Sequence, residues 1–331
     1  MAHNVGMKIK NLVVLAFIAL MLGFSSAYLL GGKPSGEADG LGGTGSVQVI
    51  ESPDSNRSKN SGSTVQENKT SNNALKTNPA EPEIIKLAAG TRSETPLYII
   101  SGIEQGPSML VLGGVHGDEP AAFWSGNMAA RLRIQKGTLY VIPHFNVIAQ
   151  SQGTRTGIGD INRKFPGNPD STDSESRLCY EVSSLVREKG IKYVLTFHEA
   201  IDFKRVSANP GQTLYYDWEI NPYANTNLKQ EADSLIAKVN EKIKLLPGFR
   251  DVELFSSYID PIPTSATFVL MKECGVSYAF GCEVAKNNDE HRRVWFHLAF
   301  LVNWMEMKGF TVLNWSEVES QIWSGNFKTL I

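Results

Sequence analysis

Two hydrophobic patterns alternate along residues 83–331. A short unbroken apolar run, the pattern of a strand buried on both faces, occupies residues 109–115, and three further segments, 137–145, 191–200 and 276–285, are also predicted as strands. Amphipathic stretches that follow these segments predict helices at residues 119–134, 174–190, 227–246 and 291–309. Strands that alternate with helices predict an α/β fold, with a mixed, mostly parallel twisted sheet flanked by helices on both faces.

The first 30 residues follow a different pattern. Lys8 and Lys10 precede an apolar run, "NLVVLAFIALMLGFSSAYLL", and its length of up to about nineteen residues is enough for a helix to span a bilayer. Two interpretations stay open: an uncleaved membrane anchor, or a secretory signal peptide cleaved after the small residues 25–27. Under either interpretation we expect an extracytoplasmic protein that is membrane-anchored or secreted.

Residues 31–82 separate this segment from the globular part. Gly, Ser, Asn and Thr dominate them, so the segment cannot bury enough apolar surface to offset the entropy lost on ordering. We therefore expect three parts: an anchor or signal peptide at 1–30, a disordered linker at 31–82, and a catalytic domain at 83–331.

Composition argues against a nucleic-acid-binding protein and against a disulfide-rich one. Hydrophobic residues make up 42% of the 331 residues, and the formal net charge of −2 gives no reason to expect nucleic acid as a partner. The three cysteines are Cys179, Cys274 and Cys282, too few for a disulfide framework. We expect three small buried side chains, with a Cys274–Cys282 bridge as the alternative in an exported domain.

Candidate chemistry lies at the ends of the predicted strands. His116 and Glu119 follow the first strand in "VLGGVHGDEPAA", His198 ends "YVLTFHEA", and Glu283 ends "FGCEVA". The carboxyl ends of parallel strands meet at one edge of a sheet, where ligands bind. Two histidines and one glutamate match a catalytic zinc site, which has three protein ligands and one open position. H-x-x-E alone also occurs as a pair of polar neighbours on a helix.

A second stretch suits a charged substrate. "GIGDINRKFPG", residues 157–167, presents Asn162 and Arg163 side by side in a loop rich in Gly and Pro. A guanidinium binds a carboxylate through two parallel hydrogen bonds. The alternative is a surface arginine in an ordinary turn.

Taken together, the motifs resemble a known family. "GGVHGDEPAA", "DINRKFPG", "LTFHEA" and "FGCEVA" occur in that order and resemble the zinc carboxypeptidase clan. Within it they are most similar to the succinylglutamate desuccinylase/aspartoacylase family and to zinc carboxypeptidases that cleave murein peptides. The resemblance spans residues 84–310, and the joint occurrence of H-G-[DE]-E and D-[IL]-N-R-x-F-P-G makes it specific. It implies a zinc carboxypeptidase-like fold.

The resemblance also implies roles for individual residues. One zinc ion per chain would be bound by His116, Glu119 and His198. Glu283 would act as general base and then as general acid. The substrate's carboxylate would be held by the pair in the second stretch, Asn162 and Arg163.

This chain departs from the family pattern in two places. Several relatives carry an oxyanion-stabilising arginine in an N-P-R-A-like stretch. Here the matching stretch is "FNVIAQSQGTRTG", with Val147 in place of that arginine and Arg155 as the nearest replacement. The tyrosine that closes over substrate in the carboxypeptidases corresponds by spacing to Tyr258 in "FSSYIDPIP".

These observations predict a zinc metallohydrolase. We expect it to cleave an amide bond in a peptide or small molecule that carries a free carboxylate, and a cell-wall peptide fits the expected location. Two alternatives remain open. One is an N-acyl amino-acid deacylase of the desuccinylase/aspartoacylase type, and the other is a non-catalytic binding module that retains the pocket. The expected partners are the substrate and, through the N-terminal segment, a membrane.

Overall fold

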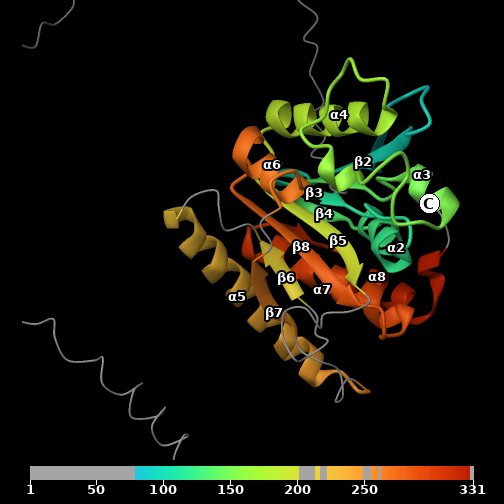
Figure 1. The fold of residues 1–331 in the computed structure, drawn as a ribbon. Coiled ribbons are helices and arrows are strands. Elements are labelled where there is room, and N and C mark those ends of the chain that lie inside the picture. Colours follow the sequence, from blue (N-terminus) through green and yellow to red (C-terminus); the bar gives the residue numbers. More distant parts are fainter. Residues whose placement is uncertain (1–78, 201–212, 217–221, 249–254, 260–261, 329–331) are drawn as a thin grey trace, which may run out of the picture. The chain divides into compact units, whose positions relative to one another are not determined.

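A mixed sheet forms the centre of the chain (Figure 1). The computed structural model describes residues 79–328 apart from 201–212, 217–221, 249–254 and 260–261. Within these residues the sheet has nine strands: β1 (Glu83–Leu87), β2 (Thr95–Ser101), β3 (Glu104–Leu112), β4 (Ile134–Ile142), β5 (Tyr193–Ala200), β6 (Thr213–Tyr216), β7 (Ser256–Ile259), β8 (Tyr278–Ala285) and β9 (Thr311–Val312).

The strand order is β1-β2-β4-β3-β5-β8-β6-β7, with β9 paired to β4. The four central strands, β4, β3, β5 and β8, are mutually parallel. Antiparallel pairs join β1 to β2, β2 to β4, β9 to β4 and β6 to β8, whereas β7 is parallel to β6. The prediction of a mixed sheet with a parallel part is confirmed, and the parallel part is its centre.

Helices cover both faces of the sheet (Figure 1). They are α2 (Pro120–Ala129), α3 (Val147–Gln152), α4 (Ser174–Lys189), α5 (Pro222–Leu245), α6 (Ala266–Cys274), α7 (Glu290–Met307) and α8 (Trp315–Trp323), with 3₁₀ turns η1 (Ile161–Arg163) and η2 (Asn326–Lys328). One core joins the sheet to α2, α5, α7 and α8, and a second joins the opposite face to α4 and α6.

The central strands explain why two cores form. In β3, Met109 and Val111 belong to the first core, and Leu110 and Leu112 belong to the second. Successive strand side chains point to opposite faces. An unbroken apolar run therefore supplies both cores, which is what the sequence pattern predicted.

Several predicted boundaries were wrong: the strand expected at 137–145 is β4, Ile134–Ile142, and the helix expected at 227–246 already begins at Pro222. The helix expected at 119–134 ends at Ala129, because Ile134 is completely buried and already begins β4. The strand expected at 109–115 ends at Leu112, because the chain turns at Gly113 and Gly114, and Gly114 has a φ of +62°.

The N-terminal predictions are not tested by this part of the chain. The predicted anchor at 1–30 and the linker up to residue 78 lie outside the described residues. Among the helices that are described, none combines the length and the apolar character needed to cross a membrane. All three cysteines are buried and free, as the first of the two interpretations expected.

Candidate metal centre and the loop beside it

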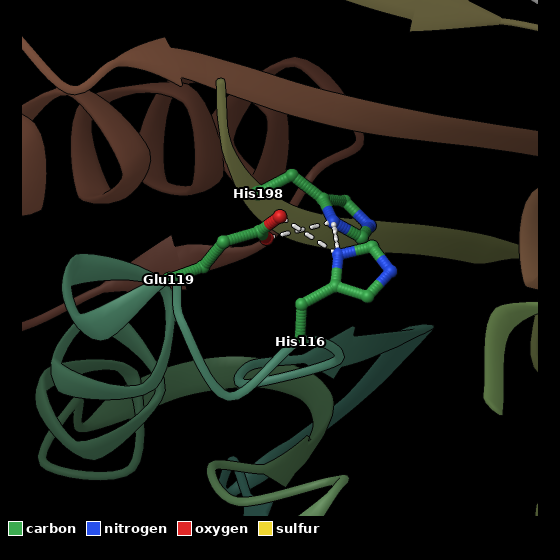
Figure 2. Close-up of side chains that lie close together, drawn as sticks. All are labelled: His116, Glu119 and His198. Carbon is green, nitrogen blue, oxygen red and sulfur yellow. Dashed lines mark hydrogen bonds and ion pairs between the residues drawn. The ribbon is translucent and has the colours of Figure 1, made fainter. Parts of the chain in front are cut away.

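Three side chains from two neighbouring strand ends converge on one point (Figure 2). His116 Nδ1 lies 2.8 Å from Glu119 Oε1, and His198 Nδ1 lies 3.1 Å from Glu119 Oε2. The two Nδ1 atoms are 3.3 Å apart. Two nitrogens bound to one tetrahedral zinc ion at 2.0–2.1 Å would be about 3.4 Å apart. The observed spacing therefore fits a shared ion.

The donor set fits a metal ion by its chemistry as well. All three residues are buried, and each has a ligand atom within 4.8 Å of the other two. Among the described residues, His116, Glu119 and His198 form the group of histidine, cysteine or acidic side chains whose ligand atoms lie this close together. Two imidazoles, one carboxylate and the lack of a fourth ligand in the group are typical of a catalytic zinc site, not of a structural one.

The turn between β3 and α2 explains how His116 and Glu119 reach this point. A Cβ atom on Gly117 would lie 2.1 Å from the carbonyl carbon of Ala149, so only glycine lets the turn pack directly on α3. Pro120 occupies the first turn of α2, where its missing N–H costs nothing. Glu119 is the N-cap of α2, but its side chain makes no capping hydrogen bond and points to the two histidines instead (Figure 2).

The electrostatics keep two of the three ligands, Glu119 and His198, in the form that binds metal, whereas the third, His116, favours its protonated form while no ion is bound. Burial by itself would raise the pKa of Glu119, but the imidazoles of His198 and His116 lower that pKa overall. Burial lowers the pKa of His198, against the attraction of Glu119. Burial also acts to lower the pKa of His116, but the carboxylates of Asp160 and Glu119 beside its ring raise that pKa to about 9. An ionised Glu119 and a neutral His198 are the forms that bind metal.

Asp160 is a part of the site that the sequence analysis missed. Its Oδ1 lies 3.5 Å from His116 Nε2, the ring nitrogen that faces away from Glu119, and accepts the Asn162 N–H at 3.0 Å. Carboxylates in this position fix the ring orientation of metal-binding histidines. Asp160 stands two residues before Asn162 in the motif "DINR", but sequence spacing does not reveal which ring nitrogen it meets.

The predicted carboxylate-binding loop lies beside the metal centre. Asn162 and Arg163 belong to η1, and Arg163 Nη1 is 3.8 Å from Asp160 Oδ2. The Asn162 side chain is buried, and its Oδ1 accepts the Ala266 N–H at the start of α6. The Arg163 side chain is 39% exposed, so a substrate carboxylate can approach it. Asp160 thus connects this loop to His116.

Two further predicted residues are near the metal ligands. Arg155 Nη1 donates to Glu119 Oε1 at 3.0 Å, and more than half of its side chain is exposed. Glu283 in β8 is the register partner of His198 in β5, so both side chains leave the same face of the sheet. Tyr258 lies in β7, but its side chain is outside the described part of the structure.

Replacing Asp160 by Asn tests whether this carboxylate supports the metal site. The variant keeps the shape of the side chain but loses the charge that faces His116, so zinc affinity should fall by about 10–100-fold. Competition with a chelating dye measures this. Asp170→Asn, at an exposed position of the same loop region, should keep wild-type affinity. Equal affinity in Asp160→Asn and wild type would show that Asp160 does not orient the ligand.

Sequence comparisons match part of this chain to known hydrolases. The family described as "Carboxypeptidase controlling helical cell shape catalytic" matches residues 85–242, slightly less than half of the chain. The N-alpha-acetyl-L-2,4-diaminobutyric acid deacetylase of Halomonas elongata is 30% identical over 135 residues. That match covers 39% of this chain and 35% of the deacetylase, so the chain matches about a third of that relative's length.

Solved structures show the same fold. A succinylglutamate desuccinylase/aspartoacylase from Rhodobacter sphaeroides aligns with a TM-score of 0.53 at 18% identity, covering 72% of this chain and 67% of its own. The mDAP-bound D,L-carboxypeptidase Csd4 of Helicobacter pylori aligns with a TM-score of 0.52 at 25% identity, covering 63% and 52%. The resemblance predicted from the motifs is confirmed: parts of this chain are similar to a carboxypeptidase family and to a deacetylase, and the chain shares the fold of the solved desuccinylase/aspartoacylase and carboxypeptidase structures.

Proposed function

We propose that this protein is a zinc-dependent hydrolase that cleaves an amide bond next to a free carboxylate in a peptide or small molecule. The observation that carries the proposal is the convergence of His116, Glu119 and His198 within hydrogen-bonding distance of one another. Asp160 contacts both His116 and Arg163. The guanidinium of Arg163 therefore lies near the three residues and can bind the substrate's carboxylate. The named relatives, a D,L-carboxypeptidase and a deacetylase, support this class of reaction.

Each protein group has a distinct task in this mechanism. His116, Glu119 and His198 would hold zinc, which would polarise the scissile carbonyl and make water a stronger acid. Arg163, with the NH₂ group of Asn162, holds the carboxylate of the substrate and so orients the amide bond. Arg155, at the edge of the site, donates to the oxyanion that develops from the carbonyl oxygen when water adds to the carbonyl carbon. Glu283 takes the proton of the attacking water and gives it to the leaving amine.

A specific observation favours a second candidate substrate class. The relative with 30% identity is a deacetylase of an N-acetylated amino acid. A carboxypeptidase and such a deacylase use the same ligands and differ in which side of the amide bond carries the recognised carboxylate. Csd4 has also been solved with a bound tripeptide, which is a reason to place peptides first.

We also propose an extracytoplasmic location. Lys8, Lys10 and the apolar run after them support export, with the segment either retained as an anchor or cleaved. A cell-wall peptide is the substrate that fits this location best.

Glu283→Gln tests catalysis against simple binding. The amide cannot accept the proton of the attacking water, so kcat should fall by about 10²–10⁴-fold while zinc content stays unchanged. Steady-state kinetics and metal analysis measure the two effects. Glu273→Gln, at an exposed position of α6, serves as the control. A variant at position 283 with wild-type turnover would contradict the assigned base, and a wild-type protein that binds zinc but turns over no muropeptide or N-acyl amino acid would favour a binding module.

Arg163→Lys tests carboxylate recognition. Lysine keeps the charge but loses the paired hydrogen bonds, so kcat/KM should fall by about tenfold or more for substrates with a free carboxylate. It should fall much less for the matching carboxamides, so the wild-type preference for the carboxylate shrinks. Arg133→Lys, whose exposed side chain pairs with Glu317, is the matched control. An equal loss for both kinds of substrate would remove Arg163 from substrate binding.

Cell fractionation with intact-mass analysis tests the location. An anchor predicts a full-length chain in the membrane fraction, and a signal peptide predicts a chain shortened at its N-terminus outside the membrane. In both cases protease added to spheroplasts should digest the catalytic domain. A full-length chain that stays protected in the cytoplasmic fraction would contradict the proposal.

A further inference from the structure

A second buried polar cluster lies behind the metal centre. Its members, which we call the clamp, are Glu199 of β5, Arg293 and His297 of α7, and Ser125 of α2, and all four are at most 9% exposed. Glu199 directly follows the ligand His198, and neighbouring strand residues point to opposite faces. The clamp therefore faces α2 and α7, on the other side of the sheet from the proposed chemistry.

Glu199 takes over the capping of α2. Its Oε2 accepts the Ala121 N–H at 2.9 Å, and its Oε1 forms an ion pair with Arg293 Nη1. The first N–H groups of a helix need partners outside the helix. Pro120 has no N–H, and the side chain of the N-cap Glu119 makes no capping bond. The carboxylate of Glu199 fills this role from the neighbouring strand.

His297 makes a second connection one helical turn further along α7. Its Nε2 donates to the backbone carbonyl oxygen of His198 at 3.0 Å, and its Nδ1 lies 2.9 Å from Ser125 Oγ in α2. Residues four apart on a helix lie on the same face. Arg293 and His297 thus hold the end of β5 and the beginning of α2 against one face of α7.

We propose that the clamp is a positioning device that sets the spacing of Glu119 and His198, and so the affinity of the site for its metal. Glu119 stands two residues before Ala121, and His198 stands one residue before Glu199, so the Ala121–Glu199 hydrogen bond fixes the two ligand-bearing backbones relative to each other. A buried ion pair often adds no more stability than apolar residues of the same size, which argues for such a role beyond stability. This proposal rests on one part of the proposed function, namely that His116, Glu119 and His198 bind zinc.

The first experiment compares zinc affinities by competition with a chelating dye. Glu199→Gln and His297→Leu should each bind zinc about 10–100-fold more weakly than wild type. His297→Gln keeps a donor for the His198 carbonyl and should restore most of the affinity. The control is Glu231→Gln in α5. It breaks the ion pair between Glu231 and Lys308, which lies at the end of α7 opposite to Arg293, and should leave zinc affinity unchanged. Wild-type affinity in both clamp variants would overturn the proposal.

The second experiment uses metal-free protein and follows amide hydrogen exchange in the first turn of α2. Glu199→Gln should speed exchange at Ala121, and Glu231→Gln should not. Unchanged exchange at Ala121 would also overturn the proposal. If the wild-type protein binds no zinc, the proposed function fails. The exchange data then still test whether Glu199 holds the first turn of α2 in place. His297→Leu leaves every charge of the ion pair in place, so it keeps the test available should Glu199→Gln not fold.

Discussion

The architecture of the site follows from one constraint: two imidazoles and a carboxylate share a small buried space. Burying a charge is costly unless it is paired, so His116, Glu119 and His198 must be held close and at fixed angles. The chain meets this requirement by ending two neighbouring parallel strands, β3 and β5, at the same edge of the sheet. The glycine-rich turn after β3 then brings His116 and Glu119 back toward His198 (Figure 2).

The sheet separates chemistry from support. His198 and its register partner Glu283 leave one face of the sheet, on the side of the core that includes α4 and α6. Glu199 leaves the other face and contacts α2 and α7. Asp160 extends the site sideways, because it faces both the outer nitrogen of His116 and the guanidinium of Arg163. The candidate metal ligands and the loop that carries Arg163, which come from distant parts of the chain, thus lie side by side.

The sequence predicted the central strands of the sheet better than its edge strands. Strands β3, β4, β5 and β8 were predicted because burial in the centre of the sheet makes their segments rich in apolar residues, most clearly in β3, where the apolar run is unbroken. Strand β1 was missed because Ile84 and its neighbours are exposed at the edge of the sheet, which leaves no such run. His116, Glu119 and His198 were picked out as candidate ligands because they stand at the ends of buried strands, and the structure brings these three side chains together. Asp160 and Glu199 also stand inside the motifs that the sequence analysis singled out, DINR and LTFHEA. Their partners, His116 and Arg293, come from other elements. Sequence spacing does not encode which side of the His116 ring Asp160 meets, or which face of the sheet Glu199 leaves.

Anomalous diffraction at the zinc absorption edge, on crystals of zinc-treated protein, tests the central claim most directly. The account predicts one peak per chain, about 2.0–2.1 Å from the Nδ1 atoms of His116 and His198 and about 2.0–2.2 Å from a carboxylate oxygen of Glu119, with one position left to solvent. A zinc ion bound elsewhere, or the two imidazoles turned apart with no ion between them, would contradict it.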